Sequence, residues 1–175
     1  LLTMQSRRLK PNSSGRAALE DSIRRVQSIA AVHNLLSRDD LGTTSIQDIA
    51  KQVTENFRMT IVEDVAIHFE ITGDPVLVSS RQATVLAILI NELIGNARDH
   101  GLSATGGTIG VDCWQEGELA FVQVRDDGPT RPPARRRVRT GLGLNLIETL
   151  VNVDLNGCFE SKRPAQGTRA TIIFP

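Results

Sequence analysis

The hydrophobic positions at the start of the chain follow a helical repeat. Residues 1–10 (LLTMQSRRLK) predict the end of one helix, the PNSSG stretch interrupts it, and residues 17–37 resume the helical spacing. The second helix carries an apolar stripe formed by Leu19, Ile23, Val26, Ala30 and His33 and widened by Ile29, Val32 and Leu36. One hairpin cannot bury so wide a stripe, so we expect two hairpins to pair as a four-helix bundle in a homodimer. The alternative is a hairpin that folds back on its own globular domain.

From residue 43 onward the pattern changes to mixed helices and strands. Thr44 and Gln47 are expected to cap a helix, residues 65–71 alternate as a strand, and Ser79 with Gln82 is expected to cap a long helix. Further strands are predicted over 108–114, 119–126 and 168–174 and in the NGCFESK segment, with a helix over 142–153. Because these elements lack a βαβ rhythm, the predicted fold class is α+β. A helical hairpin (1–42) would precede an α/β sandwich with a largely antiparallel sheet (43–175).

Charge and cysteine content narrow the function classes. The 175 residues hold 20 Lys and Arg against 20 Asp and Glu, so net charge gives no reason to expect direct nucleic-acid or membrane contact. Cys113 and Cys158 fit neither a disulfide framework nor a metal quartet and are expected to be reduced core residues, which indicates a cytoplasmic protein. The longest apolar run, residues 85–90, is too short to span a membrane. The chain opens on Leu-Leu without an initiator Met, which suggests a fragment.

A group of polar residues interrupts the apolar pattern of the long helix in the stretch ILINELIGNARDHG. Glu92 and Asn96 are four residues apart and therefore share a helix face, with Asn91 to one side. A carboxylate beside an amide oxygen suits Mg²⁺, which takes few protein ligands and completes its shell with water and phosphate oxygens. The alternative is an ordinary amphipathic helix end at which Asn96 and His100 satisfy the last carbonyls.

Two further stretches favour a nucleotide site. In VRDDGPT, Asp126 continues the inward alternation of its strand, and a buried carboxylate needs a donor such as the exocyclic amine of adenine. Gly128 would let the backbone approach the base. The stretch TGLGLNLIETLV is a glycine-rich turn that opens a helix, an arrangement whose N–H groups hold phosphate.

These motifs, in this order, resemble the ATP-binding domain shared by sensor histidine kinases, gyrase-type topoisomerases, Hsp90 and the MutL repair proteins. NELIGNARDHG resembles the N box, DDGPT the first glycine box, TGLGL the second, and GTRATIIFP the closing strand. The resemblance implies that Asn96 coordinates Mg²⁺, that Asp126 binds adenine, and that Thr168 supports the base through water. Glu92 matches the acidic residue linked to activating or orienting the nucleophile. The ATP-binding positions of the second glycine box would be Gly141, Leu142, Gly143 and Leu144, with the two glycines flanking the triphosphate.

The N-terminal part resembles a narrower family. ALEDSIRRVQSIAAVHNLLSRDD is similar to the second dimerisation helix of histidine kinases whose acceptor begins an H-x-x-x-N-N motif, the group that contains ethanolamine-utilisation sensors. The resemblance implies transfer of the γ-phosphoryl group of Mg-ATP to a histidine and then to an aspartate of a response regulator, in some cases one with an RNA-binding antitermination domain. The acceptor would lie upstream of Leu1, so this chain is expected not to phosphorylate itself. His33 belongs to the apolar stripe.

The sequence also departs from the family pattern. Thr130 stands where the first glycine box usually has its second glycine, which should stiffen the start of the lid. The lid carries Arg131, Arg135, Arg136, Arg137 and Arg139, which either form a solvated loop or meet the γ-phosphate or an acidic partner.

An anti-sigma-type serine protein kinase is the first alternative function, although it would need no long hairpin. A nucleic-acid-binding module is the second, but neutral charge and scarce aromatic residues argue against it.

Overall fold

The computed structural model describes residues 26, 30, 43–59, 66–102, 106–129 and 142–175. Of the predicted hairpin, only Val26 and Ala30 are described, and both are helical and exposed. The four-helix bundle, the homodimer and the domain boundary at residue 42 therefore stay predictions. Among the helices that the structure describes, none is both long and apolar enough to cross a bilayer.

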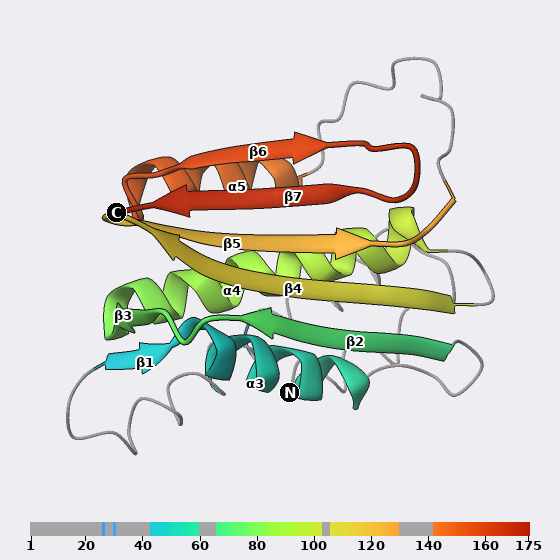
Figure 1. Cartoon of the computed structure of the whole chain (residues 1–175), viewed down its shortest axis with the longest axis horizontal. Helices are drawn as coiled ribbons and strands as arrows, with labels where there is room; N and C mark the ends of the chain where they lie inside the picture. Colours follow the sequence, from blue (N-terminus) through green and yellow to red (C-terminus); the bar gives the residue numbers. More distant parts are fainter. Residues whose placement is uncertain (1–25, 27–29, 31–42, 60–65, 103–105, 130–141) are drawn as a thin grey trace, which may run out of the picture.

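A five-stranded sheet with helices packed against one face forms the frame of the described part (Figure 1). Its strands, in spatial order, are β2 (Ala66–Gly73), β4 (Gly106–Glu116), β5 (Leu119–Asp126), β7 (Arg169–Phe174) and β6 (Cys158–Lys162). Only β2 and β4 pair in parallel, so the prediction of a largely antiparallel sheet is confirmed. The other elements are β1 (Thr43–Ser45), which pairs with β3 (Leu77–Ser79), the helices α3 (Ile46–Arg58), α4 (Ser80–Asn96) and α5 (Leu142–Val153), and the π-helix η1 (Ala97–Gly101).

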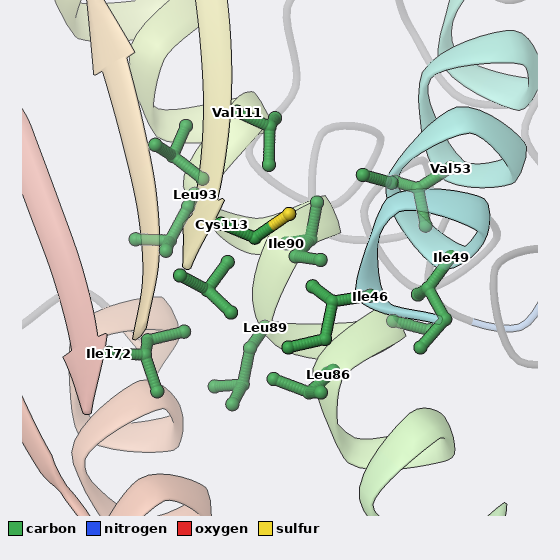
Figure 2. Packing of buried hydrophobic residues seen from close by; sticks show 14 of the residues in the cluster. Ile46, Ile49, Val53, Leu86, Leu89, Ile90, Leu93, Val111, Cys113 and Ile172 are labelled. Atoms are coloured by element: carbon green, nitrogen blue, oxygen red, sulfur yellow. The ribbon is translucent and has the colours of Figure 1, made fainter. Parts of the chain in front are cut away.

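The core lies between the helices and the inner face of the sheet. On β4 and β5, alternate side chains point inward, as the period of two requires, and bury Val111, Cys113 and Val122 completely. Helix α4 packs against this face with Leu86, Leu89 and other fully buried aliphatic residues, as Figure 2 shows. The core thus holds α4 rigidly, and the polar end of the helix projects from that support.

Capping side chains set where the helices begin. Ser79 and Gln82 form the predicted capping box at the start of α4. The prediction for α3 is wrong by one residue, because Ser45, not Thr44, is the N-cap and accepts a hydrogen bond from the Asp48 N–H at 3.1 Å. Thr44 is buried in β1, where it pairs with Val78. The two short strands, which the sequence pattern did not reveal, therefore decide which hydroxyl caps the helix.

A charged network ties three strands together on the outer face of the sheet. The Arg125 guanidinium on β5 contacts Glu70 Oε2 of β2 at 2.8 Å and Asp112 Oδ2 of β4 at 2.9 Å. It lies across Gly110, where an added Cβ would stand 2.5 Å from the guanidinium carbon. A larger residue at this position would displace the guanidinium from its two carboxylate partners.

The outer face also carries an aromatic pair at the opposite ends of these strands. Trp114 on β4 stacks on Phe121 on β5, with ring centroids 5.0 Å apart and planes 10° apart. Ile173 and Cys158 continue this row across β7 and β6. The helices lie on the other side of the sheet, so this pair faces away from the core.

The two cysteines should differ sharply in reactivity. Cys113 is buried, its thiol donates to the Asp74 carbonyl at 3.4 Å, and burial raises its pKa to about 11. Cys158 is exposed, so the prediction that it is a core residue is wrong: it alternates with the half-buried Phe159 on an edge strand and points outward. At pH 8 a thiol of that pKa is ionised in only about one molecule in a thousand, and the thiolate is the reactive form. We expect Ellman's reagent to label one thiol quickly in the native protein.

The control is the Cys158→Ser variant, which should show no fast labelling until denaturant is added. Two thiols of equal rate in the native wild-type protein would contradict this assignment.

Candidate functional site

A buried carboxylate at the end of β5 is the centre of the site. Asp126 is 8 % exposed and lies on the inner face. Its Oδ1 atom accepts the Gly128 N–H at 3.1 Å, and the Thr168 side chain forms a further hydrogen bond to it. Burial raises the pKa of this carboxyl, as does the neighbouring charge of Asp127, whereas the hydrogen bonds from Gly128 and Thr168 act in the opposite direction. A carboxylate held in this way can accept a hydrogen bond from a donor group of a ligand.

Backbone contacts with the loop before β7 hold the corner that carries Asp126. The Asp126 N–H donates to the Thr168 carbonyl at 3.1 Å, and the Gly167 N–H donates to the Gly128 carbonyl at 3.0 Å. Gly167 has a φ of +73°, and a Cβ there would stand 1.8 Å from the Asp126 carbonyl oxygen. Only glycine allows this approach.

The second aspartate of the pair has a different role. Asp127 is exposed, and its Oδ1 accepts the Thr108 N–H at the start of β4 at 2.7 Å. Its carbonyl accepts a hydrogen bond from the Gln166 side chain at 3.0 Å. Asp127 therefore fixes the corner to β4 and the β7 loop, and Asp126 alone points inward.

The polar end of α4 divides into two sides. Glu92 is half-buried and Asn96 exposed, on one helix face. Asn91 is only 4 % exposed and is therefore buried beside that face. Because Asn91 is buried, Glu92 and Asn96 remain as the candidate ligands.

Glu92 connects α4 to the glycine-rich start of α5. A Cβ added to Gly143 would stand 3.1 Å from Glu92 Oε2, so the carboxylate reaches the first turn of α5. Leu144 in the same turn is half-buried. Gly141, Thr130 and the five lid arginines lie outside the described residues, and of Leu142 only the backbone is described.

The described residues bring two groups of predicted site residues together. Asp126, Gly128 and Thr168 meet at the corner, while Glu92 meets Gly143. Sequence patterns alone assigned no role to Asp127, Gln166, Gly101 or Gly167. The available signal was weak: Gly101 ends the N-box stretch and Gly167 begins the closing-strand stretch, but nothing local shows which backbone or side chain they approach.

The oxygen donors on α4 fit a hard cation. The Asn96 amide oxygen is neutral and exposed, and the Glu92 carboxylate lies on the same face. Mg²⁺ is bound in proteins by one or two such ligands together with water and phosphate oxygens. The α5 start beside Glu92 could supply backbone N–H groups to those phosphates.

Comparison with known proteins gives the same result for both parts of the chain. Residues 82–175 match the family described as histidine kinase-, DNA gyrase B-, and HSP90-like ATPase. Residues 1–61 match the family described as histidine kinase.

Among curated proteins, the chain is similar to the sensor histidine kinase PdtaS of Mycobacterium tuberculosis, with 32 % identity over 90 % of this chain and 32 % of the relative. The PdtaS of Mycolicibacterium smegmatis is 29 % identical over 100 % of this chain and 36 % of its own. The chain thus spans only about a third of these relatives' length. Among solved structures, the histidine kinase domain of the blue-light activated histidine kinase of Erythrobacter litoralis has a TM-score of 0.73 at 19 % identity, covering 99 % of this chain and 92 % of that one.

Proposed function

Because this chain belongs to the family of histidine kinase-, DNA gyrase B- and HSP90-like ATPases, we propose that residues 43–175 are the ATP-binding catalytic part of a sensor histidine kinase. One observation carries the proposal: a single rigid helix, α4, presents Glu92 and Asn96 and then continues through η1 to the buried Asp126. A base site and a phosphate site at the two glycine-rich segments would both lie along this helix. Such a layout suits a nucleoside triphosphate.

In this proposal, Asp126 recognises adenine. Its buried carboxylate accepts a hydrogen bond from the exocyclic amine. Thr168, which is hydrogen-bonded to Asp126, supports the base through water. Gly128 lets the backbone approach the ring. A buried acceptor discriminates strongly, since a base without the amine leaves it unpaired.

The phosphates would lie between α4 and α5. The first turn of α5, with Gly141, Leu142, Gly143 and Leu144, would hold them through backbone N–H groups. Asn96 would hold Mg²⁺, which neutralises phosphate charge when bound. Glu92, beside Gly143, would orient the nucleophile.

The whole protein would pass the phosphoryl group on. Transfer from ATP to a histidine of the dimerisation hairpin would precede transfer to an aspartate of a response regulator, with a homodimer as the working unit. A regulator with an RNA-binding antitermination domain, and a kinship with ethanolamine-utilisation sensors, remain predictions from the sequence. The match of residues 1–61 to a histidine kinase family supports this reading over the anti-sigma-type serine kinase.

Calorimetric titration with ATP tests the proposed function. We expect saturable binding of one ATP per chain, strengthened by Mg²⁺ and weakened by excess EDTA, and weak binding of GTP. Incubation of the full-length protein with γ-labelled ATP should give an acid-labile, base-stable label, because phosphohistidine has that stability and phosphoserine does not. Absence of ATP binding would remove the proposal, and an acid-stable label would favour the serine kinase.

A further inference from the structure

The end of α4 has an unusual backbone that leads directly to Asp126. After Asn96 the helix continues as the π-helical turn η1, in which the Leu102 N–H donates to the Ala97 carbonyl at 2.9 Å. π-helical turns are rare and occur frequently at functional sites. This turn ends at Gly101, so whatever fixes Gly101 also fixes the end of the helix that carries Asn96.

Gly101 is enclosed by the corner that holds the buried carboxylate. A Cβ on Gly101 would lie 2.5 Å from Asp126 Cγ and 2.6 and 2.7 Å from its two carboxylate oxygens. From the other side, a Cβ on Gly128 would lie 1.7 Å from the Gly101 carbonyl oxygen. Two motifs far apart in the sequence are therefore in direct contact here.

We propose that Gly101 is a positioning residue for nucleotide recognition: the absence of a side chain keeps the Asp126 carboxylate aimed at the base, and its backbone joins that corner to the metal-binding helix. The inference rests on the proposed function and adds a residue that positions the proposed adenine-binding carboxylate. Gly101 would not touch the nucleotide itself. It would act through Asp126.

An alanine at this position would act on the carboxylate rather than on the backbone. Gly101 is not among the residues with a positive φ, so its conformation suits any L-residue. Asp126 can yield by rotating its side chain, which would break its hydrogen bonds from Gly128 and Thr168. Gly128 differs in this respect, since a Cβ there would meet a backbone oxygen that cannot rotate away.

The chain supplies a matched control on the same helix. Gly95 is a glycine of α4, and apart from its chain neighbours and the backbone of its own helix, no atom of the described residues lies within 4 Å of a Cβ built there. Gly95→Ala should therefore leave ATP affinity unchanged and raise the melting temperature, because alanine is the better helix residue.

The experiment measures dissociation constants of Gly101→Ala and Gly95→Ala for Mg-ATP and Mg-ITP. We expect Gly101→Ala to lose ATP affinity by roughly tenfold or more, the range for a hydrogen bond to a charged group, and to lose little affinity for ITP. Equal losses for both nucleotides, or wild-type ATP affinity, would overturn the proposal. Failure of the proposed function is distinguishable, because wild-type protein would then not prefer ATP over ITP.

A stability measurement decides the matter even if Gly101→Ala folds poorly. Removing the carboxylate removes the clash, so Asp126→Ala should raise the melting temperature more in the Gly101→Ala background than in the wild-type background. If Asp126→Ala changes the melting temperature by the same amount in both backgrounds, the two residues are not coupled and the inference is wrong.

Discussion

Asp126→Asn is expected to weaken ATP binding on the order of a hundredfold, the upper range for losing a hydrogen bond to a charged, buried group. The amide can turn its own N–H₂ group toward the exocyclic amine of adenine, which places donor against donor. ITP has a carbonyl in place of that amine, so its affinity should change far less. Titration of both nucleotides with the wild-type and variant proteins checks the result. Equal losses would make Asp126 a structural carboxylate.

The same variant should be more stable than the wild-type protein at neutral pH. Burial raises the pKa of Asp126, so the folded state favours the protonated carboxyl. The stability from this group is present below the unfolded-state pKa and is lost as the pH rises through the folded-state pKa. Asparagine does not ionise, so the variant does not lose this stability as the pH rises. The gain in melting temperature should therefore be largest at pH 7–8 and should shrink toward acid pH, and an opposite trend would contradict the burial argument.

Asn96→Ala should abolish the strengthening of ATP binding by Mg²⁺. The amide is an exposed ligand on a helix whose other faces build the core, so its removal should leave folding intact. Comparing dissociation constants in Mg²⁺ and in EDTA should show a gain of roughly tenfold or more in the wild-type protein, on the scale of a charge-assisted contact, and none in the variant.

Asn152→Ala is the matched control, because Asn152 is another exposed helical asparagine but lies near the far end of α5. Its Mg²⁺ dependence should equal that of the wild-type protein. Unchanged Mg²⁺ dependence in Asn96→Ala would remove the metal assignment.

Local pattern predicted the parts of this fold that depend on local physics. Ser79 and Gln82 form their capping box within one turn, and the inward phase of β5 follows from Val122 to Asp126, so both predictions were right. The resemblance to the ATP-binding family, read from short motifs, and the resemblance to histidine kinases, read from the N-terminal helix, are both confirmed by the family matches.

The failures have a common cause, which is dependence on distant residues. Ser45 replaces Thr44 as a cap because β3, more than thirty residues later, pairs with β1. Cys158 lies outward because β7 sets the register of its edge strand. No role was predicted for Gly101, because the contact that requires a glycine is with Asp126 and Gly128. No periodicity in the sequence encodes that approach.

The stacked pair on the outer face has a spectroscopic consequence. Trp114 is the only tryptophan in the chain, and it lies with Phe121 on the side of the sheet turned away from the helices and from Asp126. Its emission should follow the integrity of the sheet and stay constant when a ligand enters the other side. Intrinsic fluorescence is thus an internal standard for folding in every variant above. Nucleotide binding has to be measured by calorimetry or with a labelled nucleotide.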